Sequence, residues 1–167
     1  MRLVLSSLLV AAAIPAMAAE PQPEIQRPAA QAQAVGVAHT LRQIPEACAR
    51  IEGVFTGDAA EPYRFAVVRT SPNCQPRARF VDAARVRPTE AGGWMFNDLL
   101  RVPSGACPSQ QAVVRVWRMP VEQVPELDGQ GQLRVYAADA KQAAGATKAA
   151  VPMYAAEMSV EGEACGP

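Results

Sequence analysis

The sequence predicts a mostly β protein, a small antiparallel sandwich or barrel with two disulfides and little helix. Short runs rich in β-branched and aromatic residues alternate with clusters of glycine, proline, asparagine and serine, which is typical of strands joined by turns. Four well-separated cysteines occur in the 167 residues. An even number of cysteines in an exported chain predicts a disulfide framework. Residues 141–150, ahead of the last expected strand, fit a weak helix or a loop, because Gly145 interrupts them.

The N-terminus indicates export. It reads "MRLVLSSLLVAAAIPAMA", with Arg2 ahead of an apolar run that Pro15 ends, and Ala16-Met17-Ala18 fits the small-x-small cleavage rule. The run of about 12 residues is too short for a helix to cross a bilayer core of roughly 30 Å. We therefore expect a signal peptide over residues 1–18 and a periplasmic or extracellular protein with no transmembrane segment.

The next stretch, residues 19–44, is rich in proline, glutamine and alanine and holds no aromatic ring apart from His39. Such a composition buries too little apolar surface to offset the entropy of ordering. The sequence therefore predicts a flexible tether over 19–44, followed by a single β-rich domain over 45–167.

The expected strands follow one another at short intervals. The strongest patterns are 63–70, "YRFAVVRT", and 112–119, "AVVRVWRM". Residues 94–102 fit either a strand or a helical turn, and 78–83 is a strand that extends to Val86 in one interpretation. The remaining expected strands are 50–56, 132–138 and 152–162.

The four cysteines allow three pairings. Laying the first expected strand antiparallel to the last, in either of two registers, directs the apolar side chains of both strands to one side. This arrangement predicts a Cys48–Cys165 bond that closes the sheet and a Cys74–Cys107 bond between two proline-containing loops.

An arginine-rich stretch, "RTSPNCQPRARFVDAARVRP", spans residues 69–88. If it were extended throughout, alternation of side chains would place Arg77, Arg79, Arg85 and Arg87 on one face, with Asp82 on the other. The face would be the solvated side of a strand, because unpaired charges are not buried. Alternatively it would bind an anion, since guanidinium groups hold phosphate and carboxylate bidentately.

Two later strands extend the same hypothesis. Trp117 and Arg115 are two positions apart, so in a strand their side chains point to the same face. An outward-facing aromatic ring beside an arginine is a binding feature. The alternative places Trp117 in the core with Arg115 at its rim. The complete set of candidate ligand-binding residues is Arg64, Arg77, Arg79, Arg85, Arg87, Arg115 and Trp117.

Recognisable catalytic patterns are missing from the sequence. His39 is the one histidine, no G-x-S-x-G or S-x-x-K motif is present, and cysteines engaged in disulfides are not nucleophiles. No metal-ligand spacing or phosphate-binding glycine loop occurs, so we expect no metal and no cofactor. Glu90 and Asp98 lie in a basic region that suits structural ion pairs. A net charge of zero gives no overall attraction to nucleic acid.

These observations favour a non-catalytic binding or inhibitor module of the cell envelope. The expected ligand is an anionic envelope glycan, a lipid phosphate or an acidic protein. Two alternatives from other classes are a small carboxylate-dependent hydrolase of the envelope and a structural subunit of an envelope assembly.

Overall fold

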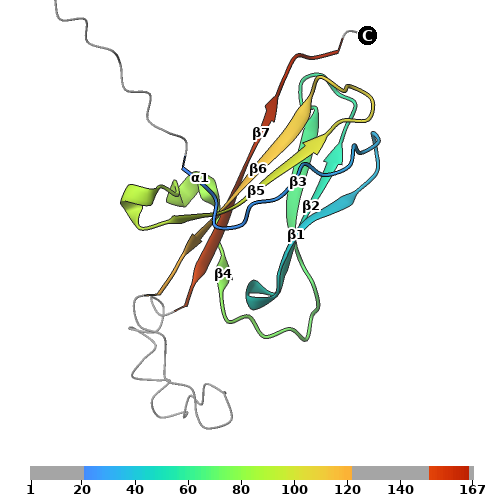
Figure 1. Cartoon of the computed structure of the whole chain (residues 1–167). Helices are drawn as coiled ribbons and strands as arrows, with labels where there is room; N and C mark the ends of the chain where they lie inside the picture. Colours follow the sequence, from blue (N-terminus) through green and yellow to red (C-terminus); the bar gives the residue numbers. More distant parts are fainter. Residues whose placement is uncertain (1–20, 122–150, 166–167) are drawn as a thin grey trace, which may run out of the picture.

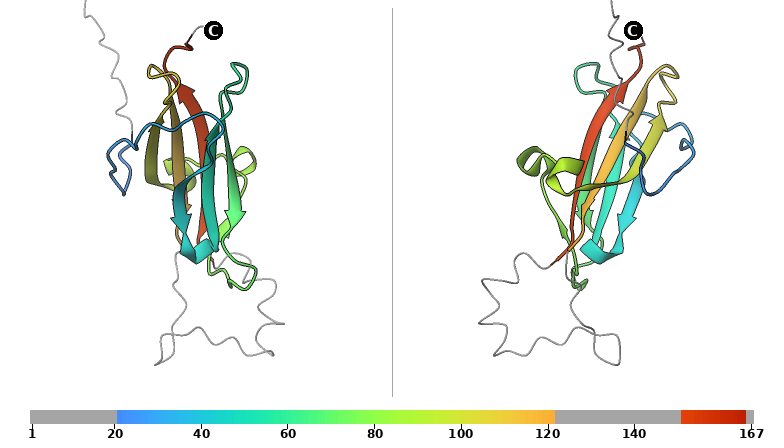
Figure 2. Two further views of the ribbon diagram at one scale, coloured as in Figure 1. Left: turned by 90° about the vertical axis from the view of Figure 1, so that its right-hand side faces the viewer. Right: turned by 60° about the vertical axis from the view of Figure 1, so that its left-hand side comes forward.

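The computed structural model of the chain describes residues 21–121 and 151–165. Within them the chain forms two sheets packed face to face (Figures 1 and 2). One sheet has the order β1 (His39–Ile44), β2 (Ala49–Phe55), β3 (Tyr63–Arg69). The other has the order β4 (Arg79–Phe80), β7 (Met153–Glu161), β6 (Gln111–Met119), β5 (Met95–Pro103). The expected mostly β fold with two disulfides and little helix is confirmed, in its sandwich form.

Alternation along the strands creates the core between the sheets. In β2, Ile51, Gly53 and Phe55 are buried, whereas Glu52 and Val54 between them are only half-buried. Val114 and Val116 of β6 project from the opposite sheet, and both are fully buried. Every strand pair is antiparallel except β4 with β7, which is parallel. The predicted signal peptide 1–18, strand 132–138 and weak helix 141–150 lie outside the described residues.

A second apolar cluster lies on the outer face of the four-stranded sheet. Trp94, Phe96 and Trp117 pack there with Ala155, beneath a cover that contains α1 (Ala83–Val86) and η2 (Glu90–Gly92). The predicted strand 78–83 is therefore reduced to the two residues of β4, and its extension to Val86 is wrong. The cause is local: the Asp82 carboxylate accepts a hydrogen bond from Ala84 N–H and caps a helical turn.

The N-terminal segment, residues 21–38, is not a free tether where the structure describes it. The N–H groups of Glu24 and Ile25 donate to the carbonyls of Phe96 and Asn97, both at 2.9 Å. Further along, Ala30 and Gln33 bond to β5, and β1 begins at His39. The domain boundary expected at residue 45 is thus wrong. A backbone can cover a sheet edge without an apolar face, which a composition argument overlooks.

The disulfides also differ from the expected pairing: they join Cys48 to Cys74 and Cys107 to Cys165, with Cα–Cα distances of 5.8 and 5.6 Å. The predicted antiparallel pairing of the first and last strands is wrong because β2 and β7 belong to different sheets. Cys48 precedes β2 at the end where β3 finishes, beside the loop that holds Cys74. Cys107 lies in the β5–β6 loop, close to the chain end after β7.

The two disulfides fit an oxidising compartment outside the cytoplasm. Across residues 21–121 and 151–165, the helices are too short to cross a membrane.

Glu24 anchors the start of the N-terminal segment, and its contribution to stability should depend on pH. Its carboxylate accepts hydrogen bonds from Arg118, at 2.7 Å, and from the Asn97 amide, at 2.9 Å. The Arg118 bond lowers the pKa of Glu24 below its ordinary value of 4.5, against a smaller opposing effect of burial. A carboxyl group with a lowered folded-state pKa stabilises the fold above the unfolded pKa, and that stabilisation is lost as pH falls through the folded pKa.

Glu24→Gln should therefore lower the free energy of unfolding by about 0.5–1 kcal/mol at pH 7, because the pair is partly exposed and screened. The difference from the unmodified protein should shrink at pH 3. Urea denaturation at both pH values measures it. An equal loss at pH 7 and pH 3 would show that the charge on Glu24 is not what matters.

Candidate binding site

The predicted arginine face is not assembled in the structure. The extended conformation that would align its side chains ends at Asp82, where α1 begins. Arg85 pairs with Asp82 across one helical turn, and Arg87 adopts a left-handed conformation at the C-cap. Arg77 and Arg79 precede this break, and their N–H groups bond to the carbonyls of Glu46 and Pro152. These four arginines therefore do not share one strand face.

The remaining candidates are divided between the two sheets. Arg64 lies on the outer side of β3, where it pairs with Glu61 at 3.3 Å. Arg115 lies on the outer side of β6 and bonds to Ser159 and Glu161 of β7. Because the two sheets face each other, these guanidinium groups lie on opposite sides of the sandwich. The structure does not bring them together.

Trp117 occupies the outer apolar cluster rather than an exposed binding surface. Its side chain is buried, its ring centroid lies 5.0 Å from that of Phe96, and its indole N–H donates to Glu157. The interpretation in which Trp117 is a core residue and Arg115 lies at the rim describes the structure.

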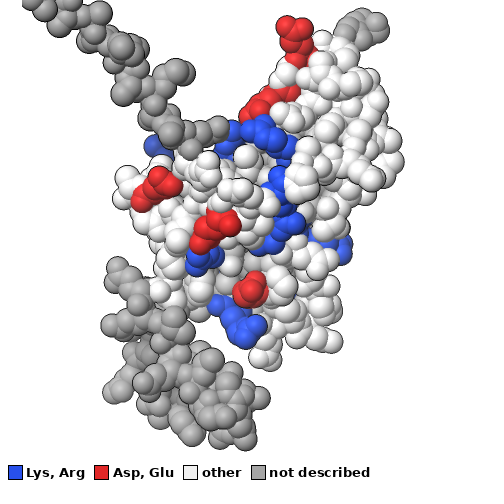
Figure 3. Space-filling view, viewed as in Figure 1, with Lys and Arg blue, Asp and Glu red and all other residues white. Residues whose placement is uncertain are grey.

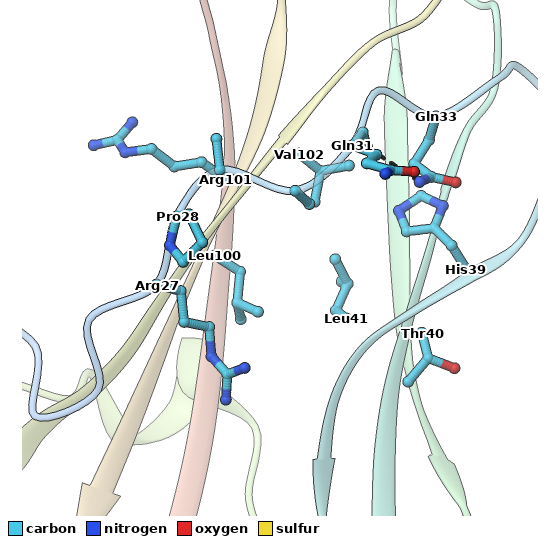
Figure 4. Close-up of a pocket in the computed structure, with 12 residues that line it drawn as sticks. Arg27, Pro28, Gln31, Gln33, His39, Thr40, Leu41, Leu100, Arg101 and Val102 are labelled. Atoms are coloured by element: carbon cyan, nitrogen blue, oxygen red, sulfur yellow. Dashed lines mark hydrogen bonds between the residues drawn. The ribbon is translucent and has the colours of Figure 1, made fainter.

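A different site lies at one edge of the sandwich, where β1 of the smaller sheet lies next to β5 of the larger sheet. The N-terminal segment passes over this edge and encloses a pocket of about 420 Å³ (Figure 4). Leu41, Leu100 and Val102 give the pocket an apolar floor. The polar residues that line it are Arg27, Gln31, Gln33, His39, Thr40 and Arg101.

Arg27 is held in the pocket wall by a buried ion cluster. Asp98 is fully buried, and its carboxylate accepts two hydrogen bonds from Arg27 Nε, at 3.0 and 3.1 Å. Arg42 Nε approaches the same carboxylate at 3.2 Å from β1, in the other sheet. The irregularity between Phe96 and Asp98 turns the Asp98 side chain inward. Two guanidinium groups thus share one carboxylate, which leaves one positive charge uncompensated within this cluster.

Arg101, on the other side of the pocket, pairs with a carboxylate that also pairs with Arg115. Its guanidinium donates to Glu161 at 2.8 Å, and this hydrogen bond holds the pKa of Glu161 below its ordinary value. Figure 3 shows basic side chains in a band across this side of the molecule, with acidic groups beside them. Asp98 is fully buried whereas Glu161 is partly exposed, so solvent screens the charges around Asp98 less than those around Glu161.

His39 is engaged through both ring nitrogens. Nδ1 lies 3.2 Å from the Val37 carbonyl, and Nε2 lies 2.8 Å from the hydroxyl of Tyr63. Since a carbonyl only accepts, the pairing assigns the proton to Nδ1, and Nε2 accepts the Tyr63 O–H. Burial raises the pKa of Tyr63 well above its ordinary value, so its hydroxyl stays protonated. This arrangement suits a fixed wall of the pocket rather than a catalytic base.

The carboxylates considered for a hydrolase are also separated. Asp98 points between the sheets and is enclosed by arginines, whereas Glu90 belongs to η2 in the cover on the outer face. The expectation that Asp98 serves in a structural ion pair is confirmed. Among the described residues, no group of histidine, cysteine and acidic side chains is arranged to hold a metal ion.

Sequence reasoning missed Arg27, His39 and Arg101 as pocket residues. Arg27 lies in the stretch interpreted as a tether, and nothing in that stretch indicates that its backbone follows β5. The available signal was "FNDLL", where Asn97 and Asp98 interrupt an apolar strand: a carboxylate buried there needs cationic partners.

No protein-family model matches the chain, and no curated protein or solved structure matches it.

Proposed function

We propose that this protein is a non-catalytic binding module of the cell envelope, which takes an anionic group in the pocket between β1 and β5. The leading observation is that Arg27 and Arg42 share the single carboxylate of Asp98 beside the pocket. An anionic ligand group would balance the remaining charge. The predicted signal peptide, together with the disulfides, supports a periplasmic or extracellular location.

The lining of the pocket supports a particular class of ligand. Arg27 uses Nε for Asp98, its side chain is 39% exposed, and no described residue accepts from its terminal nitrogens. Those nitrogens have the geometry for bidentate contact with a carboxylate or phosphate. Gln31 and Gln33 supply amides for hydroxyl groups, and the floor of Leu41, Leu100 and Val102 suits a sugar ring or short acyl chain. An acidic sugar of an envelope glycan combines these features.

The polar side chains at the pocket support a non-enzymatic role. The single histidine has both nitrogens engaged, and the nearest buried carboxylate is enclosed by two arginines. General acid–base catalysis needs a titratable group that reaches the substrate. The side chains that line the pocket are instead suited to binding an anion.

Calorimetric titration with glucuronate tests the proposal, with glucose as the neutral comparison. The protein should bind glucuronate, should not bind glucose measurably, and should bind less tightly as salt is raised. Arg27→Gln should weaken glucuronate binding about tenfold or more, since a charge-assisted bidentate contact is lost.

Arg64→Gln is the matched control, because it removes the same charge from the outer side of the other sheet. This substitution should leave the affinity for glucuronate within about twofold of that of the unmodified protein. Equal weakening by both substitutions would indicate a general effect of net charge and would refute the pocket as the site.

A further inference from the structure

The third strand of the smaller sheet, β3, is a free edge without the usual protection. Among the described residues, nothing pairs with its outer side. The edge at β5 is covered by the N-terminal segment, β1 is interrupted by an irregularity between Thr40 and Arg42, and β4 has only two residues. By contrast, β3 is seven residues long, in regular register, with no proline or charge in its centre. Such an edge is a template for another strand.

The hydrogen-bonding pattern identifies the groups that β3 offers. Thr70 N–H donates to Cys48, and Thr56 N–H donates to Pro62, at the two ends of the β2–β3 ladder. Since bonded pairs alternate in an antiparallel ladder, Ala66 bonds to β2, whereas the N–H and C=O groups of Phe65 and Val67 point away from it. An added strand would form its backbone hydrogen bonds with these four groups.

Beside this edge, the sandwich is open and apolar. Phe65 and Val67 face inward, yet Val67 is 39% exposed. Two adjoining hollows of about 370 and 420 Å³ share Val67, Phe80 and Val81 and run between β3 and β4. Side chains that alternate along an added strand would enter this groove opposite Phe65 and Val67.

The charges at one end of the groove define the partner. Arg69 and Arg79 line that end, and no described carboxylate forms an ion pair with either. The Arg69 guanidinium is fixed in place because it donates to the carbonyls of Ser71, Pro72 and Cys74. At the other end lies Asp82, which pairs with Arg85. An acidic side chain of the partner therefore belongs beside Arg69 and Arg79.

We propose that β3 is an interaction surface that accepts an extended segment of an acidic partner protein by strand addition. The segment carries apolar residues at two alternating positions, opposite Phe65 and Val67, and an acidic residue two positions away, opposite Arg69. This inference concerns the edge away from the pocket between β1 and β5 and does not depend on the function proposed for that pocket.

The probe is the capped peptide Asp-Thr-Val-Thr-Val-Thr, written for antiparallel addition, the commoner pairing. In amide-resolved NMR titration, shift changes should centre on β3 and the groove. The amides of Phe65 and Val67 should exchange rapidly in the free protein and become protected in the complex. A peptide with asparagine in place of the aspartate should bind about threefold to tenfold more weakly, and Arg79→Gln should remove that preference.

Two lysine substitutions provide the matched comparison. Val67→Lys places a charge in the groove and should weaken peptide binding about tenfold or more. Ala66→Lys places the same charge on the outer face of the strand and should leave the affinity within about threefold. Circular dichroism and thermal melts confirm that both variants are folded.

Several results would overturn the proposal. Absence of binding, or shift changes away from β3, would refute strand addition. Protection of the Phe65 and Val67 amides in the free monomer would show that the chain covers its own edge. A dimer that Val67→Lys dissociates would show that a second copy, rather than an acidic partner, occupies it.

Discussion

Asp98→Asn should lower the free energy of unfolding by about 3 kcal/mol, a fall in Tm of roughly 10–15 °C. The substitution keeps the size of the side chain but removes its charge, and Asp98 is fully buried between two guanidinium groups. Arg27 and Arg42 would then face each other without a counter-charge, where solvent screens them incompletely. Thermal and urea denaturation measure the loss.

Glu61→Gln provides the comparison, since the side chains of Glu61 and of its partner Arg64 are both more than half exposed. It should change the free energy of unfolding by less than about 0.5 kcal/mol. The cluster also holds the N-terminal segment to the sandwich, so Asp98→Asn should speed proteolysis between residues 21 and 36. Unchanged stability and unchanged cleavage would refute a structural role for the cluster.

Gly53→Ala should be nearly as damaging, with a loss of about 3 kcal/mol. A Cβ atom at Gly53 would lie 2.5 Å from Cζ of Tyr63 and closer still to its hydroxyl oxygen. The ring cannot withdraw freely, because it is 1% exposed and packs edge-on against Phe55 with centroids 4.7 Å apart. Displacing it would also break the hydrogen bond between Tyr63 and His39 at the pocket.

Val54→Ala is the neighbouring control, since Val54 lies on the outer side of β2 and is half-buried. It should cost about 1 kcal/mol or less and leave the pocket intact. For Gly53→Ala we expect, in addition, an altered His39 ring signal in NMR spectra. A stable Gly53→Ala protein with an unchanged His39 signal would contradict the close approach of Tyr63.

The local pattern of apolar and polar residues predicted the strands well where side chains alternate between solvent and core. The stretches 50–56, 63–70, 112–119 and 152–162 correspond to β2, β3, β6 and β7 within one or two residues. The ambiguous stretch 94–102 became β5 because Leu100 and Val102 bury against the other sheet. These outcomes depend on short-range periodicity, which a sequence displays directly.

The pairing of distant elements was not predictable in the same way. Apolar faces on β2 and β7 are compatible with strand pairing, but they are equally compatible with packing across a sandwich, which is what occurs. That ambiguity produced the wrong disulfides. The pocket was missed for a related reason: Arg27 reaches Asp98 over 71 positions, and only the path of the backbone along β5 brings them together.

The order of the disulfides along the chain has a consequence for oxidative folding. Cys48 bonds to Cys74 and Cys107 to Cys165, at sequence separations of 26 and 58, so the loops they close neither overlap nor enclose one another. A chain that enters an oxidising compartment from its N-terminus presents Cys48 and Cys74 before any other thiol. Oxidation in order of arrival then produces the native bonds directly, without the thiol–disulfide exchange that interleaved or nested pairs require.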